Sequence, residues 1–478
     1  MARSLDQLPP EILLAILDEM DMSELSSVIR VNRQFFNLGI RILWQVQSDI
    51  YLVKVPKSRR RVYIPWIMEL SLSRSPKVLY KRFKDFVFPN VKELRVTLKD
   101  HQGPIADCRY LTHFMNPGLQ LLRLEGDITA DFLLDVQNQC PKLRTVICCS
   151  CGPCVRPTDF LTFVRGLPYL ERLDMHEKDG HTMIDSKVIG FLATSQRIEQ
   201  LSLDRITPEM LRDALSLEAP FPEMMKLDIE IRQDAVASMV EIFNSIFALR
   251  VTLKATNTWE TEIRSRALRP LSELSRVRSL DIFVDGDMRI APEDLVSLRS
   301  LSDLRRLTIE GLHARNLRAA DFGDDDLHRL VSGLPGLDTL SLQFLTSGVT
   351  SASFATLAKC CPRLGCCDLG GAFNALDLRD YKAPLLPKLG SLRVGCFLDS
   401  DIRGIDDEAD DHDQLVENRA CEHARQLERH FPKASIWIAQ NGGYPAEVQF
   451  SMTVVKLFRR EYERDSECDS RPLDTCIP

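Results

Sequence analysis

The sequence predicts an α/β protein in which a short N-terminal helical unit precedes an irregular solenoid of about 13 strand–helix repeats. The pattern apolar-x-x-apolar-x-apolar recurs over residues 67–394 at a mean spacing of about 27 residues. A proline stands two residues before nine of the thirteen copies, where it ends a helix and imposes an extended backbone. The first 46 residues lack this period and have a helical one instead.

Each copy of the pattern predicts a short strand, and helix-like stretches such as 158–166 and 325–333 lie between copies. The central apolar residues are Leu70, Leu94, Leu122, Val146, Leu173, Leu201, Leu227, Val251, Leu280, Leu307, Leu340, Cys367 and Leu392. The spacing resembles that of leucine-rich repeats, although the Asn that usually follows the strand is mostly absent. A non-repetitive domain with several Leu-rich strands is the alternative.

Composition describes an ordinary soluble chain. The net charge of −7 argues against nucleic-acid binding as the main activity. The uncharged window 339–358 is too rich in Ser and Thr for a membrane span, and no signal peptide is evident. Fourteen scattered cysteines indicate a reduced, intracellular protein of the cytoplasm, the nucleus or both. The expected segments are a helical unit (1–46), a basic linker (47–64), the repeats (65–398), an acidic loop (399–413), a C-terminal helix with a candidate capping strand (414–440) and a tail (441–478).

Three short helices are predicted in the N-terminal unit. Pro9 and Pro10 suit the first turn of a helix whose apolar residues include Ile12 and Ile16. A second helix is expected over 24–30 and a third from about Phe35 to Trp44. So small a unit buries little apolar surface alone and normally needs a partner surface.

This segment resembles the F-box. The matching residues are Leu8, Pro9, Ile12, Ile16, Leu25, Val28, Val31, Arg33, Phe35 and Trp44. Where the family usually has a small Leu or Cys, this sequence has Asn32. Together with the repeats, the whole chain looks like the F-box/leucine-rich-repeat proteins, especially divergent fungal ones.

The resemblance implies a substrate receptor of an SCF (Skp–cullin–F-box) ubiquitin ligase that is not itself an enzyme. Its F-box would contact a Skp-type adaptor, and through it a cullin, by the residues Leu8, Pro9, Ile12, Ile16, Leu25, Val28, Val31, Phe35 and Trp44. The repeats would hold a target protein whose identity and contacts the sequence does not indicate. No catalytic residue, metal or cofactor is implied. A scaffold that binds the adaptor without recruiting a cullin is an alternative function.

Two cysteine arrangements could carry chemistry instead. Cys151 and Cys154 form a CxxC pair of the kind used by thiol oxidoreductases, or could join Cys148 and Cys149 in a zinc site. We favour an incidental Cys-rich loop, because no thioredoxin-like βαβ unit surrounds the pair. Cys140 and Cys361, each before a proline, suit the tight corner between a helix and a strand.

Charged and histidine-bearing segments complete the candidates. Residues 399–413 carry eight acids and one arginine, which predicts a mobile loop. Five basic residues between 54 and 61 predict either a solvated linker or a nuclear localisation signal. His412, Cys421, His423 and His430 share one predicted helix, and we favour a solvated helix face over a metal site.

Overall fold

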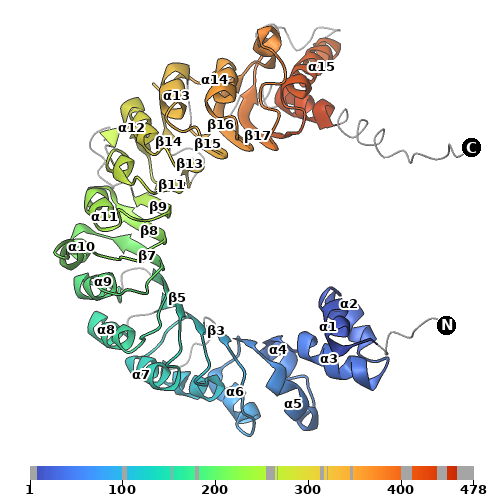
Figure 1. The fold of residues 1–478 in the computed structure, drawn as a ribbon, viewed down its shortest axis with the longest axis vertical. Helices are drawn as coiled ribbons and strands as arrows, with labels where there is room; N and C mark the ends of the chain where they lie inside the picture. Colours follow the sequence, from blue (N-terminus) through green and yellow to red (C-terminus); the bar gives the residue numbers. More distant parts are fainter. Residues whose placement is uncertain are drawn as a thin grey trace, which may run out of the picture. The chain divides into compact units, whose positions relative to one another are not determined.

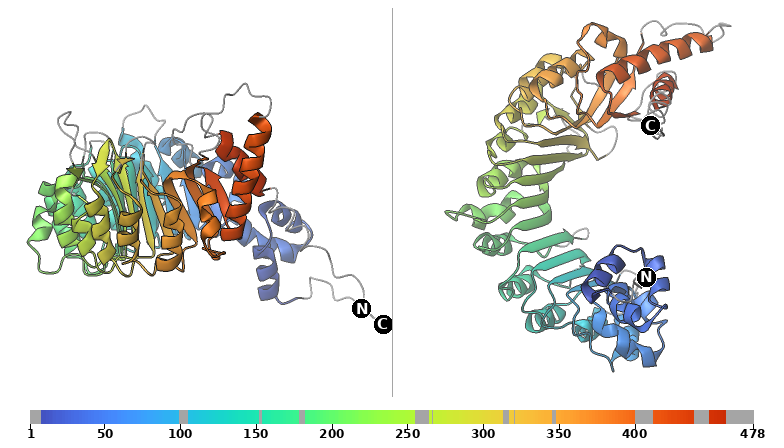
Figure 2. Two further views of the ribbon diagram at one scale, coloured as in Figure 1. Left: turned by 90° about the horizontal axis from the view of Figure 1, so that it is seen from above. Right: turned by 45° about the vertical axis from the view of Figure 1, so that its right-hand side comes forward.

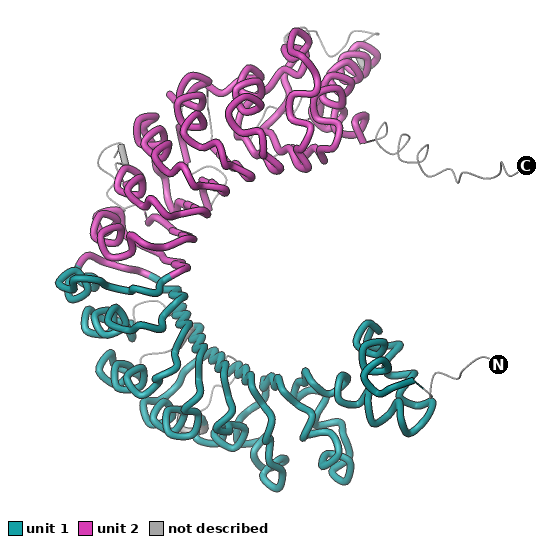
Figure 3. The backbone as a smooth tube through the Cα atoms, in the orientation of Figure 1, with its two compact units in different colours: residues 1–204, 209–224 teal, residues 205–208, 225–478 magenta. Residues whose placement is uncertain are grey.

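The structure, a computed structural model, forms two compact units. It describes residues 8–98, 105–151, 154–177, 182–254, 264–265, 267–312, 317–319, 321–344, 348–399, 412–438 and 449–459. Unit 1 comprises residues 1–204 and 209–224, and unit 2 comprises residues 205–208 and 225–478 (Figure 3). In each unit, parallel strands form one layer and helices form a second layer along one side of it (Figures 1 and 2).

Unit 1 starts with three helices, α1 (Pro10–Asp18), α2 (Met22–Val28) and α3 (Arg33–Leu43). Its parallel sheet follows sequence order through β1 (Val46–Ser48), β2 (Glu69–Leu72), β3 (Glu93–Thr97), β4 (Leu121–Glu125), β5 (Thr145–Cys151), β6 (Arg172–Glu177) and β7 (Gln200–Ile206). The connecting helices are α4 (Asp49–Leu52), α5 (Lys57–Tyr63), η2 (Ile64–Trp66), α6 (Pro76–Phe83), η3 (Ile105–Phe114), α7 (Ala130–Gln139), α8 (Pro157–Arg165), α9 (Ser186–Ala193) and α10 (Pro208–Leu215).

Unit 2 continues the same strand–helix alternation. Its sheet contains β8 (Lys226–Arg232), β9 (Ala248–Lys254), β11 (Ser279–Asp285), β13 (Arg306–Gly311), β15 (Thr339–Gln343), β16 (Cys366–Phe373), β17 (Ser391–Phe397) and β18 (Ser435–Ile438). The helices are η4 (Gln233–Ala235), α11 (Val236–Ile242), η5 (Pro270–Glu273), α12 (Pro292–Ser297), η6 (Leu298–Ser300), α13 (Asp324–Val331), α14 (Ala352–Cys360), η7 (Ala375–Asp380), α15 (His412–His430) and one over 449–459.

The register of the strands confirms the predicted repeats. Leu94 pairs with Leu122 in unit 1, and Leu307 pairs with Leu340 in unit 2, so equivalent positions of successive repeats lie side by side. All thirteen predicted central residues are buried, Leu201 at 2% exposure and Leu340 at 0%. The predicted final strand at 434–438 is also present, as β18 paired with β17. The architecture is therefore a strand–helix repeat solenoid rather than a non-repetitive domain.

One repeat was placed in the wrong frame. The sequence pattern puts Val251 at the centre of β9, but Leu249 is the residue that pairs with Leu227 and with Leu280. Ile246, Leu249 and Val251 are all buried and restore the pattern two residues earlier. The error arose because Val251 and Leu253 also face the core, so β9 satisfies the pattern in two frames.

A small second sheet explains the longest spacings between repeats. Extra residues after β9, β11 and β13 form the parallel strands β10 (Arg264–Ser265), β12 (Met288–Ile290) and β14 (Leu317–Arg318). The 33-residue gap between Leu307 and Leu340, which lies outside the usual range of leucine-rich repeats, contains β14. The insertion lengthens the loops and leaves the main register intact.

The segment expected to be a basic linker (47–64) is folded. It contains most of β1, together with α4 and α5, and β1 pairs with β2 at the start of the sheet. Arg60 is buried, donates to the carbonyls of Val55 and Arg82 at 3.0 and 3.1 Å, and lies 4.7 Å from the Phe83 ring. Since a localisation signal must be read as an accessible basic run, the burial of Arg60 argues against that interpretation.

The C-terminal segments also depart from expectation. A helix over 449–459 lies in what was expected to be a tail (441–478), and its Phe450, Val454 and Phe458 are buried. Asp399, the first residue of the expected acidic loop, is buried, whereas residues 400–411 lie outside the described residues. In the part of the chain that is described, no helix is long and apolar enough to cross a membrane.

Candidate functional site

Helix α1 presents apolar residues on two adjacent faces. Leu13 and Leu17, one helical turn apart, are 1% exposed, whereas Ile12 and Ile16 are 50% and 38% exposed. The helix starts at Pro10, and the carbonyl of Pro9 accepts hydrogen bonds from the amides of Ile12 and Leu13 at 3.1 Å. One side of α1 therefore belongs to the core, and the other presents isoleucines to solvent.

Helices α2 and α3 are fixed by side-chain caps. Asp21 accepts from the Ser23 and Glu24 amides, and Glu24 accepts from the Asp21 amide, forming a capping box. The amide of Glu24, and then the hydroxyl of Ser23, lower the pKa of Asp21. Asn32, the departure from the F-box pattern, caps α3 by accepting from the Phe35 amide at 2.8 Å.

Close packing joins α3 to its neighbours. A Cβ added to Gly39 would lie 2.5 Å from Cγ2 of Ile29 and 3.2 Å from Cδ1 of Leu25. Leu25 is fully buried, and both α1 and α2 pack against α3. Glycine is needed at position 39 because a larger side chain would separate the helices.

The nine residues predicted to contact an adaptor fall into three groups. Pro9, Ile12, Ile16 and Val31 are exposed, and Val31 is exposed at 68%. Leu8, Val28 and Trp44 are half-buried. Leu25 and Phe35 are buried in the helical unit, so they stabilise it and are not available to a partner.

Trp44 has a structural contact of its own. Its ring stacks on Tyr63 with centroids 4.4 Å apart and an interplanar angle of 12°, which ties the end of α3 to α5. Sequence reasoning missed Met22, which is 58% exposed in the first turn of α2. The exposed apolar residues of the helical unit that are named here, Pro9, Ile12, Ile16, Met22 and Val31, are together called the apolar helix face.

The sheet of unit 2 presents a polar side to solvent. Buried and half-buried residues alternate along β11, where Asp281 is half-buried between two buried neighbours and Asp285 is half-buried at the end of the strand. Asp368 accepts from Nε2 of Gln343 at 2.7 Å and lies 3.3 Å from Nη1 of Arg393. Partial burial raises the pKa of Asp368 above its usual value. This surface can bind a polar partner through several strands at once.

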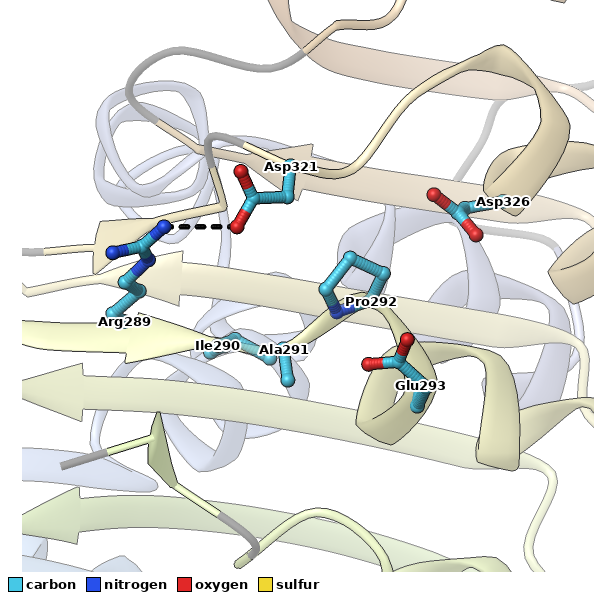
Figure 4. A pocket seen from close by; sticks show the side chains of 7 residues that line it. All are labelled: Arg289, Ile290, Ala291, Pro292, Glu293, Asp321 and Asp326. Atoms are coloured by element: carbon cyan, nitrogen blue, oxygen red, sulfur yellow. Dashed lines mark hydrogen bonds and ion pairs between the residues drawn. The ribbon is translucent and has the colours of Figure 1, made fainter.

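A pocket of about 310 Å³ lies beside the small second sheet (Figure 4). It is lined by Arg289, Ile290, Ala291, Pro292, Glu293, Asp321 and Asp326. Nη2 of Arg289 lies 2.8 Å from Oδ2 of Asp321, and Glu293 and Asp326 stand on the other side of the hollow. The titratable groups of the described lining are the carboxylates of Glu293, Asp321 and Asp326 and the guanidinium of Arg289.

The CxxC pair lacks the geometry of a thiol oxidoreductase. Cys151 ends strand β5, Cys154 is exposed in the following turn, and α8 begins only at Pro157 with Arg156 as its N-cap. A reactive first cysteine is normally activated at a helix N-terminus, and Cys151 is not at one. Cys148 is 1% exposed and Cys149 half-buried, as neighbouring residues on opposite faces of β5.

The cysteines before proline occupy the expected corners. Cys140 and Cys361 are buried and form the C-caps of α7 and α14, each with an amide that donates at 2.8 Å to the preceding helical turn. Burial raises the pKa of Cys140 to about 11 and that of Cys361 to about 12. Both thiols are therefore protonated at neutral pH.

We expect iodoacetamide at pH 8 to leave Cys140 and Cys361 unlabelled in the folded protein, because the thiolate is the reactive form. Exposed Cys154 should be alkylated readily. Mass spectrometry of time-resolved labelling measures both. Labelling of Cys361 as fast as Cys154 under native conditions would contradict the corner assignment.

Two histidines of α15 are buried, contrary to the predicted solvated helix face. His423 and His430 are 0% exposed, and Nε2 of His423 lies 3.2 Å from Oδ2 of Asp399. Arg419 also contacts Asp399, with Nε 2.9 Å from Oδ2, and the Phe450 ring packs edge-on against His423 at 5.1 Å. Among the described residues, no group of three or more potential metal ligands is assembled.

Acid should loosen this C-terminal region. Burial, together with Arg419, lowers the pKa of His423, while Asp399 and Glu422 oppose the shift; burial and Arg429 lower the pKa of His430. The unfolded state then binds more protons as the pH falls below about 6.5, so the stabilisation present above this pH is lost on acidification. The protection factors of the α15 amides, which are exchange rates corrected for the intrinsic pH dependence of amide exchange, should fall between pH 7.5 and 5.5, and less so in His423→Gln. A pH-independent wild type would contradict the assignment.

Comparisons with known proteins add little to this description. No protein-family model matches the chain, and no curated protein sequence matches it. The fold is similar to a chain in the crystal structure of the Rad7 and Elc1 complex in yeast, with 13% identity over 81% of this chain and 88% of that chain and a TM-score of 0.40. A TDR receptor structure matches 73% of this chain and 58% of that chain at 13% identity, with a TM-score of 0.30. Similarities this weak carry no argument about function.

Proposed function

We propose that the chain is the substrate-recognition subunit of an SCF-type ubiquitin ligase. The observation that supports this most is the apolar helix face, where Ile12 and Ile16 remain exposed although the same helix buries Leu13 and Leu17. Exposed aliphatic residues grouped on one helix are typical of a partner site. The sequence that forms this helix resembles the F-box, which binds a Skp-type adaptor and through it a cullin.

The repeats provide the second half of the proposed function. Their strands offer polar side chains to a target protein, while their helices cover the other side of each sheet. Binding the target and the adaptor on one chain raises the effective concentration of the target near the ubiquitin-transfer subunits. The chain itself supplies binding surfaces, and it acts in the cytoplasm, the nucleus or both.

Two alternative functions can be distinguished from this one by experiment. A scaffold would bind the adaptor and a target but not recruit a cullin. An oxidoreductase would depend on Cys151 and Cys154, which lie at a strand end and in a turn rather than at a helix N-terminus.

The test is reconstitution from purified components. We expect the full-length chain to elute with a Skp-type adaptor and a cullin as one complex in size-exclusion chromatography, and a deletion of residues 1–46 to elute alone. Adaptor without cullin in the complex would favour the scaffold. Absence of adaptor binding by the full-length chain would overturn the receptor proposal.

A further inference from the structure

Residues linked by backbone hydrogen bonds form a row along the N-terminal edge of the unit 2 sheet. Its first four members are Met225, Phe247, Arg278 and Arg305, each of which precedes a strand. The amide of Phe247 donates to the carbonyl of Met225 at 3.0 Å, that of Arg278 to Phe247 at 2.8 Å, and that of Arg305 to Arg278 at 2.8 Å. Successive members therefore stand about 4.8 Å apart, the spacing of neighbouring strands.

All four side chains point into solvent. Met225 is 49% and Phe247 36% exposed. Arg278 and Arg305 are also exposed, as are their neighbours Arg276 and Arg306. Arg278 lies 5.6 Å from the centre of the Phe247 ring. Within the part of the chain that the structure describes, none of these four arginines forms an ion pair. Asp338 follows Arg305 in the row, its amide donating to the Arg305 carbonyl at 2.7 Å, and among the described residues neither the Asp338 nor the Asp303 carboxylate forms an ion pair with Arg305.

The equivalent edge of unit 1 pairs an arginine with an acid, and there Glu199 follows Glu171 in turn, its amide donating to the Glu171 carbonyl at 2.8 Å. There Arg144 occupies the position of Arg278, with its carbonyl accepting from the amide of Glu171 at 2.8 Å. Glu171 follows it in the row and pairs with it, Nη1 to Oε1 at 2.8 Å. In unit 2 an arginine follows an arginine instead, and like charges on neighbouring strands are unfavourable. A polyanionic ligand would relieve that repulsion.

We propose that Phe247, Arg276, Arg278, Arg305 and Arg306, here called the arginine patch, bind a short acidic segment of the target protein. The row of four members spans about 15 Å, which matches four or five extended residues. Guanidinium groups bind carboxylates or phosphates in a bidentate manner, and Phe247 with Met225 suits an apolar residue at one end of the segment. The inference rests on the proposed receptor function for its biological meaning.

A protein segment is favoured over nucleic acid for two reasons. The chain as a whole carries a net charge of −7, which repels a long polyanion approaching from any other side. The row also ends in two exposed apolar side chains, Met225 and Phe247, which match a peptide side chain better than a sugar–phosphate backbone. The acidic groups of the segment can be carboxylates or phosphates, and the experiment separates these.

The test measures binding of fluorescein-labelled peptides to the purified full-length chain by anisotropy. One peptide carries four consecutive glutamates followed by leucine and phenylalanine. A second replaces the glutamates with phosphoserine, a third replaces them with glutamine, and a single-stranded DNA of similar length is the fourth probe. We expect the glutamate or the phosphoserine peptide to bind, the glutamine peptide not to bind, and affinity to fall as salt rises. Tighter binding of the phosphoserine peptide identifies phosphate as the preferred group.

The variant Arg278→Ala/Arg305→Ala/Arg306→Ala should weaken that binding by about tenfold or more. The matched control Arg212→Ala/Arg363→Ala/Arg425→Ala removes the same charge from exposed positions elsewhere and should change it by less than about twofold. The proposal would be overturned if both triple variants lost affinity equally. It would also be overturned if neither acidic peptide bound, or if the DNA bound more tightly than both acidic peptides. Thermal melting confirms that the variants are folded.

The two proposals fail separately. Adaptor binding by the arginine variant should equal that of the wild type, because the substituted residues lie in unit 2 and the apolar helix face lies in unit 1. Loss of peptide binding with adaptor binding intact assigns the defect to the arginine patch. If the wild type binds the acidic peptide but not the adaptor, the arginine-patch proposal stands and the receptor proposal is overturned.

Discussion

Replacing Leu340 with alanine is expected to lower the free energy of unfolding by about 2–5 kcal/mol. Leu340 is 0% exposed and pairs in register with Leu307 on one side and Cys367 on the other, so the lost methyl groups leave a cavity at the centre of three repeats. Each repeat depends on its neighbours for burial, so the defect should destabilise adjacent strands as well. Urea unfolding followed by circular dichroism measures the change.

Leu312 provides the matched control for this substitution. It is 50% exposed, so Leu312→Ala should change the unfolding free energy by no more than about 0.5 kcal/mol. Leu201→Ala, at 2% exposure in β7, tests the same argument elsewhere in the chain. Equal, small effects of Leu340→Ala and Leu312→Ala would contradict the assigned register.

Replacing Ile12 and Ile16 with alanine is expected to weaken binding to a purified Skp-type adaptor by about thirtyfold or more. Exposed apolar anchors at the centre of an interface typically contribute about 2 kcal/mol or more, which corresponds to that factor. The fold should survive, because the core side of α1 is made by Leu13 and Leu17. These positions are better suited than Leu8 and Pro9, since Leu8 is half-buried and the carbonyl of Pro9 starts the helix.

The control removes aliphatic surface elsewhere in unit 1. Ile50 and Val62 are 44% and 49% exposed on α4 and α5, and Ile50→Ala/Val62→Ala should leave adaptor affinity unchanged. Calorimetry or a pull-down with purified adaptor gives the comparison, with thermal melting to confirm folding. Undiminished adaptor binding by a folded Ile12→Ala/Ile16→Ala variant would remove the apolar helix face from the proposed contact.

The sequence predicted which apolar residues make up the helical unit, but it did not predict which of them are buried and which are exposed. The helical period places Ile12, Ile16, Leu25 and Phe35 on apolar faces, yet it does not say which face is covered. The packing on α3 decides this: Gly39 allows Leu25 and Ile29 to approach α3 closely, and Leu25 is fully buried there. Ile12 and Ile16 lie on the side that this packing does not reach.

Local patterns determined the repeats, because a proline, a short apolar alternation and a helical stretch act within one repeat length and recur along the chain. They determined the strand at Leu340 and the corner at Cys361 without reference to distant residues. Only the tertiary structure decided the frame of β9, the burial of Arg60 and His423, and the adjacency of Arg278 and Arg305. Each of these depends on a contact between residues far apart in sequence, where register and desolvation outweigh local preference.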